Sequence, residues 1–258
     1  MTENLYDDLD LLYREIWGLS LHHGAWKTGR ESIAEARENL IDLALEFLDP
    51  KGTIADVGCG YGILAQKIAD QFGCRVIANT NSEKQASRIS PHPRIEVLQG
   101  NWLRHPPAPE SLDGVLAIES LSHFTSFEGF LKHTLPALKP GGRIVICDWY
   151  SENGSRLFLR HLSSTGNLPP WRSIDFLHSK ARALNLKVRH SLDFSQEVAP
   201  TWSALLWRSI SLPLRKPSLM GPLLKKTLSR PALLLAFPLI RLAYETGDLE
   251  YHIVSYEK

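Results

Sequence analysis

A short apolar strand runs directly into a turn with three glycines, and a helix follows the turn. The strand is predicted over residues 53–57, the turn reads DVGCGYG over residues 56–62, and the helix is predicted over residues 63–72. Glycine lets the backbone turn sharply and approach a ligand closely. The start of a helix offers free N–H groups and a positive dipole. The unit therefore predicts an α/β fold with a ligand site at the turn, the alternative being a plain strand–helix connection.

Apolar strand-like segments and helix-patterned segments alternate through the first 150 residues. Further strands are expected at residues 75–78, 95–98, 114–118 and 143–147, and further helices at 82–89 and 127–138. Short apolar strands that alternate with helices indicate a parallel sheet covered on both faces.

The two ends of the chain follow other patterns. The expected elements are helices over residues 6–17, 33–47, 173–184 and 231–245, strands over 187–192 and 249–256, and an irregular basic segment over 201–226. We expect the last two strands to pair as a hairpin at the sheet edge, with the irregular segment inserted between them.

The acid before the first glycine narrows the ligand class. A dinucleotide-binding turn would read G-x-G-x-x-G, whereas this turn has D-x-G-x-G-x-G spacing that starts at Asp56. A carboxylate there would repel a pyrophosphate but suits an ammonium group. S-adenosyl-L-methionine has an amino-acid head and no phosphate, so the turn favours this cofactor.

The segment from Thr53 to Tyr150 resembles the core of class I methyltransferases. The resemblance depends on ADVGCGYG (55–62), LQGNWL (98–103), LDGVLAIES (112–120) and LKPGGRIVICD (138–148). Residues 6–26 resemble the N-terminal region of tocopherol-type small-molecule methyltransferases. The sterol and cyclopropane-forming branches share the spacing of Glu119 and His123 with this chain. The resemblance implies a Rossmann-like, seven-stranded, mostly parallel sheet with an antiparallel last strand, N-terminal helices and a helical lid.

The resemblance also implies a set of cofactor-binding residues. Asp56, Gly58, Gly60 and Gly62 would hold the methionine part, Thr80 and Asn81 the ribose, Asn101 and Trp102 the adenine, and Ile118 and Glu119 would line the sulfonium, with Tyr6 and Gln85 completing the set. Many relatives have an acid where this chain has Thr80 and Asn101. Neutral acceptors form weaker hydrogen bonds than charged ones, so we expect weaker cofactor binding or compensating contacts.

Three residues are the candidates for catalysis. His123 follows Glu119 by four residues, a spacing shared with the sterol, tocopherol and cyclopropane-forming branches, and a histidine suits base work at neutral pH. His123 could instead only cap a helix, and Glu119 could bind the cofactor or steady a cation. His22 and His23 are adjacent, and His23 is predicted to face the site. Neighbouring Cys or Asp ligands are missing from this pair, so a metal is not expected.

Composition excludes several partner classes. The net charge of +1 gives no general attraction to nucleic acid. Three cysteines in or beside apolar segments fit a reduced compartment. The acidic first residues do not resemble a signal peptide, and the sequence has no uncharged apolar run long enough to span a membrane. We therefore expect a cytoplasmic enzyme without a nucleic-acid partner.

The lid segment has a local charge bias. Residues 201–243 contain seven basic residues, no acidic residue and many large apolar side chains. Such a segment predicts a solvated helical lid with basic outer faces, a peripheral contact with anionic lipid, or a partner interface. We expect one domain, with an N-terminal cap (1–50), a cofactor-binding core (51–150) and an acceptor-side region (151–258) whose lid spans about 197–246.

These features together predict an enzyme that transfers a methyl group from S-adenosyl-L-methionine to a small, largely apolar or lipid-like molecule. The Glu119 and His123 spacing favours methylation of carbon or oxygen over nitrogen. Two alternatives stay open. One is a cyclase or isomerase that uses the cofactor without methyl transfer, and the other is a non-catalytic binding protein.

Overall fold

The computed structural model describes residues 15–258 except 106, 125, 153–158, 161–170, 220 and 222–231. Its centre is a seven-stranded sheet in the order β3-β2-β1-β4-β5-β7-β6. The strands are β1 (Thr53–Val57), β2 (Arg75–Thr80), β3 (Ile95–Gln99), β4 (Leu112–Ile118), β5 (Leu138–Tyr150), β6 (Lys187–Asp193) and β7 (Glu250–Glu257). Neighbouring strands from β3 to β5 pair in parallel, whereas β7 is antiparallel to both β5 and β6. The predicted mostly parallel sheet with a reversed last strand is confirmed.

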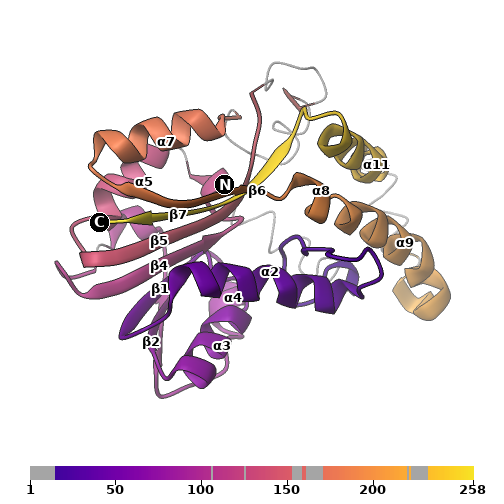
Figure 1. Cartoon of the computed structure of the whole chain (residues 1–258). Coiled ribbons are helices and arrows are strands. Elements are labelled where there is room, and N and C mark those ends of the chain that lie inside the picture. The colour runs from indigo at the N-terminus through magenta and orange to yellow at the C-terminus, as the bar shows by residue number, and fades with distance from the viewer. Residues whose placement is uncertain are drawn as a thin grey trace.

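Helices cover both faces of the sheet and one of its ends (Figure 1). They are α2 (Ile33–Leu48), α3 (Ile63–Phe72), α4 (Glu83–Ala86), α5 (Phe127–Thr134), α7 (Ile174–Ala183), α8 (Ser195–Val198), α9 (Pro200–Arg215) and α11 (Ala232–Glu245), with short 3-10 turns η1 (Trp102–Arg104), η2 (Leu121–His123) and η3 (Pro217–Leu219). Helices α5 and α7 lie on one face, and α2 and α3 lie on the other. Helices α8, α9 and α11 lie beyond one end of the strands.

Alternate residues of the central strands enter two separate cores. In β1, Ile54 packs with α2 and α3, whereas Ala55 and Val57 pack with α5 and α7. Side chains alternate between the two faces of a strand, and both faces are covered, so the strands are apolar at nearly every position.

The segment between β6 and β7, which we call the insertion, differs from expectation. The last two strands pair at the sheet edge as expected. However, α9 is a 16-residue helix where irregular structure was expected. Its start has a proline in the first turn, where the missing N–H costs little, and Trp202, Leu205 and Leu212 are buried on one side. Packing of that side against the rest of the protein stabilises the helix. The helical period of apolar residues is not visible in the sequence, because apolar residues also occur on the exposed side.

Three of the predicted elements differ from the structure by three residues or more at one end or both. The helix expected over residues 82–89 is only α4, and α5 ends at Thr134 instead of residue 138. Strand β5 begins earlier than expected, because Leu138 already pairs with Leu112 of β4. The KPGG sequence after Leu138 therefore belongs to the strand and does not only end the helix.

Candidate active site

A cavity of about 340 Å³ opens at the carboxyl ends of β1, β2 and β4. Ligands of open α/β sheets bind at this end of the strands. Its wall contains these residues predicted from the sequence: Asp56, Gly58, Gly60, Thr80, Asn81, Gln85, Asn101, Trp102, Ile118, Glu119 and His123. It also contains residues that the sequence did not indicate, among them Leu19, Ser20, Leu21, Asn79 and Ser120. Tyr6 lies outside the described residues.

The three turn glycines have left-handed backbone angles but different surroundings. Their φ angles are +81° at Gly58, +56° at Gly60 and +76° at Gly62. A Cβ atom at Gly58 would lie 2.3 Å from the Cβ of Ser120, whereas one at Gly60 would meet no atom of the described residues within 4 Å. Gly60 therefore faces open cavity space. Gly62 is not among the residues that line the cavity and begins α3. Its contact with the methionine part of the cofactor stays a prediction.

Asp56 is a buried acid with an unused oxygen. It is 2% exposed, and its Oδ2 has no hydrogen-bond partner within the described part of the chain. Burial raises the pKa of Asp56 to about 7, because a charged group is destabilised away from water. A cationic group in the cavity would satisfy this oxygen and favour the ionised carboxylate.

The residues after β2 form a small polar network. Thr80 Oγ1 donates a hydrogen bond to Gln85 Oε1 at 2.7 Å and accepts one from Ser82 N at 3.2 Å. The Thr80 hydroxyl therefore has protein partners in both roles, while the neighbouring Asn81 is exposed at the cavity wall. Asn81 and the Nε2 group of Gln85 are better placed than Thr80 for contacts with a ligand.

Asn101 and Trp102 shape the wall beyond β3. The Oδ1 atom of Asn101 accepts a hydrogen bond from Leu103 N at 2.9 Å and so begins η1. Trp102 is 1% exposed, and its Nε1 donates to Thr134 Oγ1 at 3.0 Å. The indole is thus a fixed part of the core, with only an edge at the cavity.

Glu119 has an unusual backbone and an ionised side chain. Its φ angle is +50°, a conformation that costs energy for a residue with a Cβ and is found at functional sites. Burial opposes ionisation of the carboxyl, but the electrostatic contact and hydrogen bonding from His23 outweigh it and hold the pKa of Glu119 below its usual value. An ionised carboxylate therefore lines the cavity.

His123 is the last residue of η2 and lines the same cavity as these acids. Burial lowers the pKa of His123 below its usual value, and the charge of Glu119 only partly opposes this effect. The backbone before it is fixed, because Ser122 N donates to Asp148 Oδ2 at 2.9 Å. His123 is therefore a neutral ring at pH 7, held at the cavity wall.

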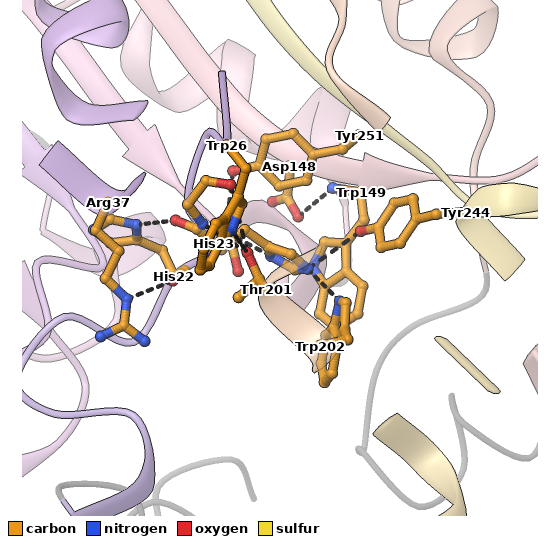
Figure 2. A network of polar contacts seen from close by, with 12 residues as sticks. His22, His23, Trp26, Arg37, Asp148, Trp149, Thr201, Trp202, Tyr244 and Tyr251 are labelled. Atoms are coloured by element: carbon orange, nitrogen blue, oxygen red, sulfur yellow. Dashed lines mark hydrogen bonds and ion pairs between the residues drawn. The ribbon is translucent and has the colours of Figure 1, made fainter. Parts of the chain in front are cut away.

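The two adjacent histidines lie in different environments (Figure 2). His22 lines the cavity, whereas His23 does not. His23 is fully buried, its Nδ1 lies 2.9 Å from Glu119 Oε1, and its Nε2 accepts a hydrogen bond from Trp202 Nε1 at 2.7 Å. The ring of His23 therefore lies inside the protein, with Nε2 bonded to Trp202, and not at the cavity wall where it was expected.

Comparisons with known proteins agree with this geometry. Residues 55–146 match a family described as a methyltransferase domain. Chloroplastic tocopherol O-methyltransferase from Arabidopsis thaliana is 26% identical over 98% of this chain and 80% of its own length. A 24-methylenesterol C-methyltransferase 2 from Oryza sativa subsp. japonica is 29% identical over 79% of this chain and 61% of its own length. A mycolic acid cyclopropane synthase, solved with SAH and CTAB, has the same fold, with a TM-score of 0.84 at 18% identity over 99% of this chain and 95% of that chain.

The protein is an S-adenosylmethionine-dependent methyltransferase with a methyltransferase domain at residues 55–146. It is similar to class I small-molecule methyltransferases. Its cofactor is S-adenosyl-L-methionine. The cavity of this methyltransferase fits the cofactor. Among the described residues, Oδ2 of Asp56 is unpaired and suits the ammonium group, and no side chain occupies the space over Gly60.

Two features of other protein classes are missing from the described residues of this methyltransferase. They contain no group of three or more His, Cys, Asp or Glu side chains that could hold a metal ion. None of their helices has the length and apolar character needed to cross a membrane.

Proposed function

We propose that this methyltransferase methylates a carbon or oxygen atom of a small, largely apolar molecule. One observation carries the proposal: a single cavity wall holds both the unpaired carboxylate oxygen of Asp56 and the neutral ring of His123. The first can bind the amino-acid head of the cofactor, and the second can accept a proton from the acceptor.

The residues of the chain divide the work in this proposal. Bound S-adenosyl-L-methionine supplies an electrophilic methyl group, so neither a metal nor a covalent intermediate is needed. Asp56 binds the ammonium head, Asn81 and Gln85 contact the ribose, and Asn101 contacts the adenine. Glu119 provides negative charge on the sulfonium side of the cavity. His123 takes a proton from the acceptor. Such a base is needed only where the nucleophilic atom of the acceptor carries a proton.

The acceptor is proposed to be apolar because of apolar residues in the cavity wall and the names of the relatives. Leu19, Leu21, Ile41 and Phe124 contribute apolar surface to the cavity. The two curated relatives named above carry tocopherol and a methylenesterol in their names. A prenylated phenol or a sterol-like molecule is therefore the acceptor class to test first.

The direct test combines binding and transfer. Calorimetry with S-adenosylhomocysteine measures cofactor binding, and incubation of prenylated phenols and sterols with methyl-labelled cofactor measures transfer. We expect His123→Ala to lower the transfer rate by about a hundredfold or more while the Kd for S-adenosylhomocysteine stays the same. A full transfer rate in His123→Ala would remove His123 from the role of base.

Two other functions were open from the sequence. A cyclase or isomerase would convert its substrate without consuming the cofactor, and a binding protein would convert nothing. The relatives named as methyltransferases favour methyl transfer over the cyclase. Labelled product together with S-adenosylhomocysteine would exclude both alternatives, whereas a rearranged, unlabelled product would support the cyclase.

We also propose that the insertion brings the enzyme to an anionic membrane surface. On α9, Trp207, Ile210 and Leu214 recur at helical spacing and are 72%, 56% and 84% exposed. The surrounding sequence, residues 201–243, has seven basic and no acidic residues. An apolar stripe in a basic segment suits anionic headgroups, and a cytoplasmic enzyme could meet an apolar acceptor there.

Sedimentation with vesicles tests the membrane contact. The protein should bind phosphatidylglycerol vesicles and not phosphatidylcholine vesicles, with weaker binding at high salt. Replacing Trp207 and Leu214 together by Ser should weaken binding by about tenfold or more. Phe176→Ser, which changes an exposed aromatic residue on α7, is the control that should leave it unchanged. Equal vesicle binding by the unmodified protein and the variant with both Trp207 and Leu214 replaced would contradict the proposal.

A further inference from the structure

One continuous stretch of chain, residues 19–26, contacts both the cavity and the insertion. Residues 19–22 line the cavity. A few residues later, Gly24 N and Trp26 Nε1 donate hydrogen bonds to Thr201 Oγ1 of α9 at 3.1 and 2.9 Å. The wall of the cofactor cavity and the insertion are therefore joined through a segment only eight residues long.

The ring of His23 connects the two sides within this stretch (Figure 2). An indole N–H can only donate, so the hydrogen bond from Trp202 Nε1 requires an unprotonated Nε2 on His23. The ring hydrogen is then on Nδ1, which lies 2.9 Å from Glu119 Oε1. Tyr244 of α11 places its hydroxyl 3.4 Å from the same Nε2. Trp202 and Tyr244 thus fix the tautomer that faces Glu119.

Glu119 uses one carboxylate oxygen for this network. Its Oε1 accepts hydrogen bonds from His23 N at 2.6 Å and from the hydroxyl of Tyr251 at 3.0 Å. The hydrogen bonds and the ion pair of this carboxylate with the described residues are made by Oε1. Since Glu119 also lines the cavity, its Oε2 is the oxygen left for a ligand.

We infer that His23 is a positioning residue that couples cofactor binding to the packing of α9 and α11. The inference rests on the proposed placement of the cofactor in the cavity. A ligand held by Glu119 and by residues 19–22 restrains His23 from two sides, and the His23 ring restrains Trp202 and Tyr244. Buried hydrogen bonds in a connected network strengthen one another. Cofactor binding would thus order the insertion, without any contact between cofactor and insertion.

Hydrogen exchange of the α9 and α11 amides, with and without saturating S-adenosylhomocysteine, tests the coupling. In the unmodified protein the ligand should slow exchange in both helices by about tenfold, the effect of about one buried hydrogen bond. Trp202→Phe keeps a ring in the core but removes the N–H, and should reduce the slowing to about twofold or less. Trp207→Phe is the matched control, since it makes the same change at an exposed position of the same helix.

Two substitutions of His23 separate its contact with Glu119 from its contact with Trp202. His23→Asn keeps an N–H donor near the position of Nδ1, and His23→Gln keeps an acceptor near the position of Nε2. Neither side chain reaches both Glu119 and Trp202, so both variants should lose the slowing by ligand while the Kd for S-adenosylhomocysteine changes by about threefold or less. These variants also serve the test if Trp202→Phe does not fold.

The outcomes separate this inference from the proposed function. Full slowing in the Trp202→Phe or His23 variants, or no slowing in the unmodified protein that binds the ligand, would overturn the coupling and leave the proposed function intact. If calorimetry detects no binding of S-adenosylhomocysteine to the unmodified protein, the proposed function itself fails.

Discussion

Asp56 and Glu119 are two buried acids in one cavity wall, and their pKa values are shifted in opposite directions. Burial raises the pKa of Asp56 to about 7. At Glu119 burial acts in the same direction, but the contacts with His23 outweigh it and the pKa is lowered. Asp56 therefore needs a cation from the ligand to be ionised well below pH 7, whereas Glu119 is already ionised.

This difference predicts how two substitutions discriminate between ligands. Asp56→Asn should weaken S-adenosylmethionine and S-adenosylhomocysteine equally, by about tenfold or more, because both ligands carry the ammonium group. Glu119→Gln should weaken S-adenosylmethionine more than S-adenosylhomocysteine, since only the former has a positive sulfur. Calorimetry with both ligands measures this, and Glu96→Gln, on the exposed side of β3, is the control. Equal losses for Glu119→Gln would show that Glu119 does not lie near the sulfonium.

The histidine pair shows what a single residue's sequence context cannot reveal. Adjacent residues of an extended segment face different sides, so one histidine of the pair was expected at the site. The structure places His22 there, because Trp202 and Tyr244 bury the ring of His23. Those partners lie 179 and 221 residues further along the chain, and no local pattern predicts that they pack on His23.

At the scale of elements, prediction succeeded where local and tertiary preferences agree. The bounds of β1 and α3 were predicted to the residue, since a fully buried strand, a glycine turn and an amphipathic helix follow one another. Helix α9 was missed because its exposed side has Trp207, Ile210 and Leu214, so apolar residues occur around the whole helix and mask the period.

The glycine turn gives a prediction that separates stability from binding. Ala at position 58 or 60 adopts a left-handed angle, which costs about 1 kcal/mol or more. Only Gly58→Ala also places a methyl group 2.3 Å from Ser120 Cβ, so its Tm should fall further than that of Gly60→Ala. Gly60→Ala should nevertheless weaken S-adenosylhomocysteine by about tenfold, because its methyl group enters the cavity. Thermal melting and calorimetry of the two variants check this, and unchanged binding in Gly60→Ala would mean that the ligand lies elsewhere.

At the scale of the whole molecule, the sheet order gathers acids at one end. Strands β1, β4 and β5 are neighbours, and their carboxyl ends carry Asp56, Glu119 and Asp148. The strand order could be expected from the family resemblance, so the meeting of these side chains was predictable. Their ionisation was not, because it depends on how completely the insertion and the N-terminal segment exclude water from this end.

Burial raises the pKa of both Asp56 and Asp148 to about 7, although two backbone N–H groups partly oppose the effect at Asp148. In the unfolded chain such carboxyls titrate near ~3.9. Between these values the folded state binds more protons than the unfolded state, so the free energy of unfolding falls as pH rises. The stabilisation is complete below about pH 4 and is lost as pH rises through about 7.

The protein without ligand should therefore lose stability between pH 5 and pH 8, by up to about 3 kcal/mol for each of the two groups. Asp56→Asn cannot ionise and should flatten part of this slope. Saturating S-adenosylhomocysteine should also flatten it, because its ammonium group stabilises the ionised Asp56 in the folded state. Denaturant unfolding at pH 5, 6, 7 and 8 measures the slope in each case. A slope that the ligand leaves unchanged, but that Asp56→Asn partly flattens, would show that Asp56 titrates as described yet does not bind the ammonium head.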